Sequence, residues 1–352
     1  QEKIVHDVDI IIQDKEIDVV VEVMGGIEPA FTFVKKALEA GKSVCTSNKA
    51  LVAAHGPELL AMAKERSLNF MFEASVGGGI PIIRPLNQSL TADEITQITG
   101  ILNGTTNYIL TKMSQEGSSY EDVLKEAQDL GYAERNPEAD VEGYDACRKI
   151  AILSSLMFSK NVDSEKVPTE GITKITAADF EYANATDHTI KLLGRSRAID
   201  DNTAEVMVAP FLLSKEHPLA MVHGVFNAVF VTGNMLGDSM YYGRGAGKLP
   251  TASAVVSDVV DCARHQGKVI MCFWDKEEVK LADIGEAERS FFIRAKAGAE
   301  DAVTAAFPGG RMVHLKDRKE DFGYFTQSMK EKDFQAKYEA LGGQMLGRIR
   351  LV

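Results

Sequence analysis

Residues 17–75 alternate between short apolar runs and helical patterns, and this alternation constrains the fold more than any other feature. The run at residues 17–23, IDVVVEV, is β-branched and nearly continuous, which is typical of a parallel strand covered on both faces. The pattern predicts strands at 17–23, 42–47 and 69–75, with helices at 28–40 and 56–67. This order predicts an α/β fold with a Rossmann-type, doubly wound sheet.

Glycines or small polar residues follow each predicted strand. Gly25 follows the first strand, Lys49 the second, and three glycines at 77–79 follow the third. Ligands of such sheets bind outside the carboxyl ends of the strands, so these positions are candidates for ligand contact. Taken singly they stay ambiguous, because Lys49 could be an ordinary surface lysine and the glycines a tight turn.

A dinucleotide-binding sheet normally opens with a strand, a G-x-G-x-x-G turn and a helix, and this fingerprint does not occur near residue 1. The chain starts Gln1-Glu2-Lys3, without an initiator methionine. We therefore expect an N-terminally incomplete protein, in which residues 1–76 form the remaining half of the dinucleotide-binding domain.

Three further parts follow that domain. Residues 77–240 mix strands with helices and predict an α+β unit. Residues 241–270 hold a glycine-rich stretch and a helix that starts at Pro250, which we expect to return to the dinucleotide-binding domain. Residues 286–352 predict the order βαββαβ, which is the ferredoxin-like arrangement.

Charge and composition exclude several classes of protein. The formal net charge of −12 argues against a nucleic-acid or acidic-membrane binder, because both need a basic face. No apolar run of about eighteen residues occurs, so no membrane span is expected. The four cysteines form no CxxC pair, and we expect reduced thiols in a cytoplasmic protein.

Asp145 and Lys149 stand four residues apart on a helix predicted over 143–158, so both side chains lie on one face. Ile152 continues near this face, which indicates that it turns inward. A carboxylate and an ammonium group held there can orient a substrate and move a proton. Judged by spacing alone, however, a plain helical salt bridge is the better explanation, because such pairs are common. Glu134, in the loop before the helix, could hold a substrate ammonium group or could be a solvated acid.

Taken in order, several segments closely resemble the signature of homoserine dehydrogenases. They are EASVGGGIPI at 73–82, GILNGTTNYIL at 100–110, LGYAE at 130–134, DVEGYDACRK at 140–149 and YGRGAG at 242–247. The tail resembles an ACT domain, the ferredoxin-like regulatory module of many bacterial members, although the usual DRPG turn is absent.

The resemblance implies reduction of L-aspartate 4-semialdehyde to L-homoserine with NADPH or NADH, on the path to threonine, methionine and isoleucine. It implies Lys149 as the proton donor, Lys49 beside the nicotinamide and the substrate, and Asp145 and Glu134 as substrate ligands. It implies that Gly25, Gly131 and Gly247 contact the cofactor or the substrate. It also implies a sodium site made of one acid, Glu73, and the backbone oxygens of Val76, Gly78 and Ile80.

The resemblance also implies a homodimer or homotetramer that pairs through residues 77–240, and an amino-acid effector for the tail. It does not decide between NADP and NAD, because the ribose-reading residue belongs to the absent half of the domain. The alternative is a non-catalytic relative that senses an amino acid, or an inactive fragment without the cofactor fingerprint.

Overall fold

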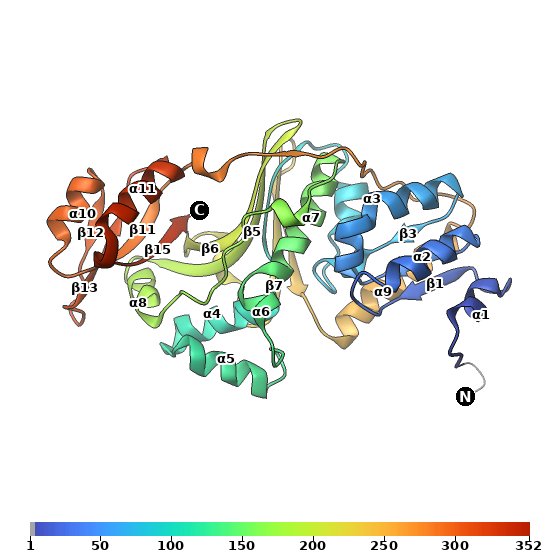
Figure 1. The fold of residues 1–352 in the computed structure, drawn as a ribbon, viewed down its shortest axis with the longest axis horizontal. Helices are drawn as coiled ribbons and strands as arrows, with labels where there is room; N and C mark the ends of the chain where they lie inside the picture. Colours follow the sequence, from blue (N-terminus) through green and yellow to red (C-terminus); the bar gives the residue numbers. More distant parts are fainter. Residues whose placement is uncertain (1–3) are drawn as a thin grey trace.

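The computed structural model describes residues 4–352 as three parts arranged in a row (Figure 1). The N-terminal part, in blue, lies at one end, the central part in the middle, and the tail, in orange and red, at the other end. The expectation drawn from Gln1-Glu2-Lys3 lies outside the described residues.

The N-terminal part holds the predicted parallel sheet, in the order β1-β2-β3. Its strands are β1 (Val19–Glu22), β2 (Ser43–Thr46) and β3 (Phe70–Met71), and its helices are α1 (Val8–Gln13), α2 (Ala30–Glu39) and α3 (Lys49–Glu65). Helix α9 (Lys248–Arg264) packs against β1 and β2.

Helix α3 begins seven residues before its predicted start at Gly56. The Asn48 side chain caps it by accepting from the Leu51 N–H at 3.1 Å, and the helix continues through Gly56 and Pro57. Its first residue is therefore Lys49, and the helix itself fixes this side chain at the carboxyl end of β2.

The central part is an antiparallel sheet with helices packed on it. Its strands are β4 (Ile95–Ile101), β5 (His188–Asp200), β6 (Thr203–Ser214), β7 (Phe226–Gly233) and β8 (Gly237–Arg244). Its helices are α4 (Gly104–Glu116), α5 (Tyr120–Asp129), α6 (Glu138–Val141), α7 (Tyr144–Phe158) and α8 (Ala177–Ala185). Helix α7 packs across β4, β5 and β6.

The tail has the predicted βαββαβ order. Its elements are β11 (Phe291–Lys296), α10 (Glu300–Ala306), β12 (Arg311–Val313), β13 (Asp321–Phe325), α11 (Glu331–Leu341) and β15 (Met345–Leu351). The strands lie in the ferredoxin-like order β12-β13-β11-β15, around a core of their own that includes Phe291, Phe307 and Phe334. Short strands β9 (Lys280–Leu281), β10 (Glu288–Arg289) and β14 (Met329–Lys330) flank the tail.

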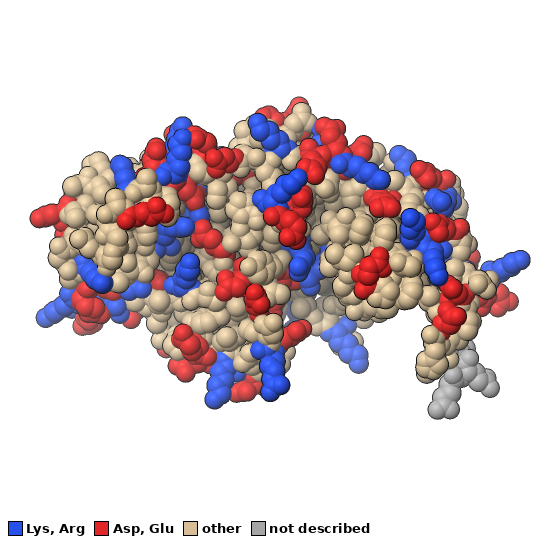
Figure 2. All heavy atoms as spheres, in the orientation of Figure 1, with Lys and Arg blue, Asp and Glu red and all other residues tan. Residues whose placement is uncertain are grey.

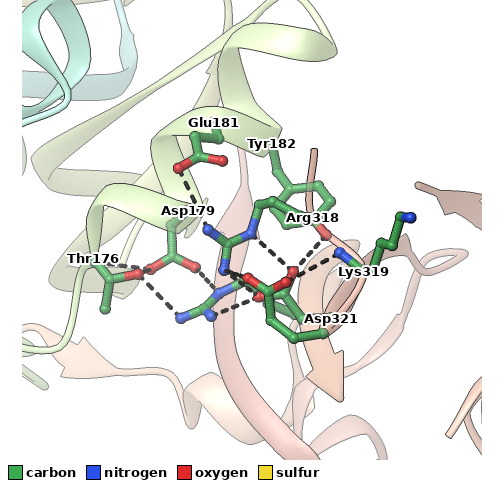
Figure 3. A network of polar contacts seen from close by, with 9 residues as sticks. Thr176, Asp179, Glu181, Tyr182, Arg318, Lys319 and Asp321 are labelled. Carbon is green, nitrogen blue, oxygen red and sulfur yellow. Dashed lines mark hydrogen bonds and ion pairs between the residues drawn. The ribbon is translucent and has the colours of Figure 1, made fainter. Parts of the chain in front are cut away.

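The tail's sheet is continuous with the central sheet. Strand β15 pairs in parallel with β6 through Arg350↔Phe211 and Leu351↔Leu212, which gives one ten-stranded sheet. A buried ion cluster lies beside this junction (Figure 3). There Arg294 of β11 bonds Asp179 of α8 at 2.8 Å and Asp321 of β13 at 3.1 Å.

Acidic and basic side chains are interspersed over the whole face seen in Figure 2. No helix in the described part of the chain combines the length and the apolar character needed to cross a membrane. The cysteines are free thiols, and Cys45 of β2 and Cys262 of α9 meet in the core with their sulfur atoms 3.6 Å apart.

Candidate active site

Asp145 and Lys149 lie in the first two turns of α7, and both are buried. Gly143 precedes the helix at φ +86°, a left-handed conformation that favours glycine. Lys149 Nζ lies 2.6 Å from Asp145 Oδ2 and donates to the Leu102 carbonyl at 2.8 Å. A solvent-exposed salt bridge therefore does not describe this pair.

Lys49 brings a second ammonium group to the same carboxylate. Its Nζ lies 2.8 Å from Asp145 Oδ1, so the carboxylate of Asp145 is held between Lys49 and Lys149. Burial alone raises the pKa of Asp145, but the two ammonium groups outweigh it and hold this pKa well below its usual range. The carboxylate is therefore ionised at every physiological pH.

Asn103 completes the cluster, and the sequence had given it no individual role. Its Nδ2 donates to Asp145 Oδ2 at 2.9 Å and to Asp140 Oδ1 at 2.7 Å. Its Oδ1 accepts from the Thr106 N–H at 2.9 Å and so caps helix α4. The one available signal was an asparagine directly before a helix, which predicts a cap but not the two carboxylates.

Asp140 differs from Asp145 in its electrostatic surroundings. Burial raises the pKa of Asp140, and the nearby Asp145 carboxylate raises it further, against the lowering effect of the Asn103 hydrogen bond. Two neighbouring acids thus have pKa values moved in opposite directions, an arrangement that recurs in active sites.

The loop that contains Gly131 and Glu134 lies beside the start of α4. Thr105 Oγ1 donates a hydrogen bond to the Tyr132 carbonyl at 2.6 Å. This bond joins the loop to the first turn of α4, two residues after Asn103. Gly131 has φ +74°, and Glu134 is exposed, with no ion pair to any described residue. The structure therefore places this loop near the cluster without bringing the Glu134 side chain into it.

A hollow of about 550 Å³ opens at the carboxyl edge of the parallel sheet. It is lined by Val23 after β1, by Ser47 after β2, and by Gly247 and Lys248 at the start of α9. Gly25 has φ +84° with open space around it. The edge where cofactors bind in this fold class thus contains both predicted glycines.

Glu73 and the glycine turn after β3 form a separate group. The Glu73 carboxylate accepts from the backbone N–H groups of Ile82, Ile83 and Arg84 at 2.7, 2.8 and 2.9 Å. Gly78 has φ +56°, and a Cβ there would lie 2.4 Å from the Gly245 carbonyl oxygen. The Glu73 carboxylate therefore binds the backbone N–H groups of residues 82–84. The glycine turn packs closely against the segment that leads to α9.

Comparison with known proteins gives consistent results. The family described as homoserine dehydrogenase matches residues 81–260, and the family described as homoserine dehydrogenase, NAD binding domain, matches residues 1–73. The homoserine dehydrogenase of Bacillus subtilis is 53% identical over 71% of this chain and 58% of its own length. That of Synechocystis is 49% identical over 74% of this chain and 61% of its own length. The chain thus spans less than two thirds of these relatives.

Solved structures agree with the sequence relatives. A homoserine dehydrogenase from Thiobacillus denitrificans superposes with a TM-score of 0.90 at 37% identity, covering 99% of this chain and 85% of that one. A hyperthermophilic archaeal homoserine dehydrogenase in complex with NADPH superposes with a TM-score of 0.64 at 32% identity, covering 73% of this chain and 75% of that one. The family matches half of this chain, and the Bacillus subtilis relative is 53% identical over 71% of it. The chain therefore belongs to the homoserine dehydrogenase family.

Proposed function

We propose that this protein interconverts L-aspartate 4-semialdehyde and L-homoserine, with NADP or NAD as the hydride carrier. The observation that carries the proposal is the buried carboxylate of Asp145 between Lys49 and Lys149, which come from two different parts of the fold. One lysine lies at the cofactor edge of the sheet and the other on the helix of the central part, so the cluster stands where cofactor and substrate would meet.

In the reducing direction, the nicotinamide supplies a hydride to the aldehyde carbon when it is bound. We assign to Lys149 the transfer of a proton from Nζ to the developing alkoxide oxygen. Asp145 orients this ammonium group through the 2.6 Å contact between its Oδ2 and Lys149 Nζ. Lys49 adds a fixed positive charge on the side of the cofactor, where it stabilises the negative charge of the transition state.

The substrate's amino-acid end needs partners of the opposite charge. We propose that Glu134 and Asp145 bind this end of the substrate, Glu134 near its ammonium group, with the backbone of Gly131 at its edge. Support comes from the Thr105–Tyr132 hydrogen bond, which keeps this loop beside the cluster. The exposed Glu134 side chain has room to turn toward a bound amino acid.

We propose that the cofactor occupies the hollow at the carboxyl edge of the parallel sheet. We propose that the backbone at Gly25 and Gly247 approaches it closely, since neither glycine has a side chain that would intervene, and that Lys49 borders its nicotinamide end. The archaeal relative that was solved with NADPH supports a nicotinamide cofactor of this class. The choice between NADP and NAD stays a matter for experiment.

For the sodium ion, we propose the main-chain oxygens of Val76, Gly78 and Ile80 as ligands, because carbonyl oxygens suit a hard cation. Glu73 would contribute through its main chain, because three backbone N–H groups already occupy its carboxylate. We further propose a homodimer or homotetramer that acts in the cytoplasm and an amino-acid effector at the tail.

The test is an assay of homoserine oxidation by the full-length protein, with NADP⁺ and NAD⁺ in parallel and appearance of the reduced nicotinamide as the readout. We expect turnover with at least one cofactor and none with L-serine, whose shorter side chain does not reach the same position. Absence of homoserine-dependent turnover with both cofactors would refute the proposal.

A further inference from the structure

One edge of strand β6 is shared by segments from distant parts of the chain. Strand β15 of the tail pairs with it at Phe211 and Leu212. Earlier on the same strand, Val208 donates from its N–H to the Pro168 carbonyl at 2.9 Å and accepts from the Glu170 N–H at 2.8 Å. The segment 168–170 therefore lies along β6, next to the tail strand.

The Glu170 side chain joins this segment to the tail. Its Oε1 accepts from Arg350 Nη2 at 2.7 Å and from Arg348 Nη2 at 3.2 Å, both on β15. Arg350 is buried and is held in turn by Glu331 of α11 through a hydrogen bond of 3.0 Å from its Nε. The position of Glu170 is therefore tied to β15 and α11 at once.

The residues around Glu170 contact the start of the active-site helix on their other side. Ile172 donates from its N–H to the Val141 carbonyl at 2.8 Å. Gly171 lies so close that a Cβ there would be 2.2 Å from that same carbonyl oxygen. Gly143, the residue that precedes α7, packs closely against Thr169. A Cβ added at Gly143 would lie 3.1 Å from Thr169 Cγ2.

These contacts form a short mechanical path. It begins at Arg348 and Arg350, passes through Glu170 and its neighbours, and reaches Val141 and Gly143. Asp145 follows Gly143 by two residues and is rigidly carried by α7. The contacts of Gly171 with Val141 and of Gly143 with Thr169 are tight, so a shift of residues 168–172 is passed on to the start of α7. Glu170 itself borders a hollow of about 750 Å³ and its side chain is 42% exposed, so the two arginines are what hold it in place.

We propose that Glu170 is a positioning residue, through which the tail strand β15 sets the start of α7 and hence the location of the Asp145 carboxylate. The inference rests on the proposed function only in what it says about catalysis. The mechanical coupling between β15 and α7 stands on the contacts alone and is tested separately.

Glu170→Gln is the variant that tests the path, because it keeps the shape of the side chain and removes the charge that holds both arginines. Glu205→Gln is its matched control. Glu205 of β6 likewise pairs with a tail arginine, Arg289 at 2.6 Å, and with Arg197 at 2.9 Å. Arg289 lies 2.8 Å from Glu331, so Glu205 shares the ion network of Arg350, but its side chain forms no ion pair or hydrogen bond with residues 168–172. Glu170→Asp keeps the charge and serves as the conservative variant.

Hydrogen–deuterium exchange of the full chain measures the coupling without any need for activity. We expect Glu170→Gln to speed exchange in peptides that cover residues 141–149, with wild-type exchange there in Glu205→Gln. Unchanged exchange at 141–149 in Glu170→Gln, or an equal increase in both variants, overturns the positioning role. If Glu170→Gln does not fold, Arg348→Gln makes the same comparison from the tail side.

Steady-state kinetics of the active, full-length enzyme measure the consequence. We expect kcat/KM for homoserine to fall about tenfold in Glu170→Gln, with KM for the cofactor unchanged, and Glu170→Asp to recover part of the loss. Equal losses in Glu170→Gln and Glu205→Gln would show a merely structural role. A wild-type protein without turnover would refute the proposed function, whereas the exchange result would still decide the coupling.

Discussion

The ammonium group of Lys49 lies 2.8 Å from a carboxylate oxygen of Asp145, although one residue opens a helix of the nucleotide-binding part and the other a helix of the central part. This pair joins the two parts at the point where their ligands would meet, beside the packing of α3 on α7. The side chain of Lys49 remains 40% exposed, whereas that of Asp145 is only 7% exposed. Asp145 is therefore the buried centre of the cluster, and Lys49 is its more accessible partner.

Asp145→Asn keeps the size of the side chain and removes its charge. Lys49 and Lys149 would then face each other without a counter-ion, and Lys149 would lose the group that orients it. We expect turnover to fall about 10²-fold or more, measured as kcat for homoserine oxidation. Asp201→Asn, an exposed acid in a loop, is the control. Turnover within twofold of wild type in Asp145→Asn would contradict the assigned role.

Lys149→Ala removes the proposed proton donor while Asp145 stays paired with Lys49. We expect kcat to fall by about 10²- to 10⁴-fold with a small change in KM, because the loss concerns the transition state and not ground-state binding. The exposed Lys166, which pairs with Glu278, gives a control in Lys166→Ala. A variant of Lys149 that turns over at nearly the wild-type rate would remove this residue from the mechanism.

Two substitutions of Asn103 separate its cap from its donor role. Asn103→Asp still caps α4 but loses both N–H donors and adds a negative charge beside Asp140 and Asp145. Asn103→Ala loses the cap as well, at a cost of about 1 kcal/mol in the free energy of unfolding. We expect both variants to lose activity and only Asn103→Ala to lose the stability of the cap. Urea unfolding and kinetics measure the two effects, and full activity in Asn103→Asp would exclude the donor role.

The tail junction predicts a loss of stability in acid. Burial alone raises the pKa of Asp321, but hydrogen bonds from Arg318, Tyr182 and Arg294 lower it to about 2. Since the folded state keeps this carboxylate ionised to lower pH than the unfolded chain, its contribution is present above about pH 4 and is lost as pH falls toward about 2. The shift corresponds to about 2 kcal/mol.

Asp321→Asn should remove this part of the pH dependence, measured as the free energy of unfolding in urea at a series of acidic pH values. Asp317→Asn, an exposed acid in the same segment, should leave the dependence as in wild type. If wild type and Asp321→Asn lose stability in parallel between about pH 4 and about pH 2, Asp321 is not the responsible group.

Gly171→Ala tests how closely the segment near Glu170 is packed. A Cβ at Gly171 would lie 2.2 Å from the Val141 carbonyl oxygen, so the backbone on one side must move. We expect a loss of about 1–3 kcal/mol in the free energy of unfolding, seen as a lower Tm. Gly343→Ala has no atom within 4 Å of its new Cβ and should change Tm very little. Equal Tm values for both variants would contradict this packing.

Much of the architecture was predictable, because local pattern and tertiary environment agree in it. The run at 17–23 is nearly continuously apolar, and its residues Val19–Glu22 form a parallel strand. The order βαββαβ of the tail follows from clear periodicity. The start of α3 was not predictable in the same way, because Gly56 and Pro57 together normally mark a break. In the fold, Gly56 lies against the Trp274 ring, which belongs to a segment more than two hundred residues away.

The candidate site, like the fold, was predictable from the sequence only in part. Lys49, Asp145 and Lys149 could be named from motifs, and the structure brings these three together. The two hydrogen bonds that Asn103 donates depend on how α4, α6 and α7 meet, which no local pattern encodes. The backbone N–H groups that bind the Glu73 carboxylate could not be predicted either. They lie nine to eleven residues further along the chain, beyond an irregular turn.

The contact between Cys45 and Cys262 has a consequence for synthesis on the ribosome. The two residues are 217 positions apart, and the second belongs to α9, the helix that closes the nucleotide-binding part. The strands of this part therefore leave the ribosome long before their covering helix does. During that interval their apolar face stays open, so the domain that is made first is completed only after the central part has emerged. A pause or truncation before residue 264 should leave a nascent chain that depends on chaperones.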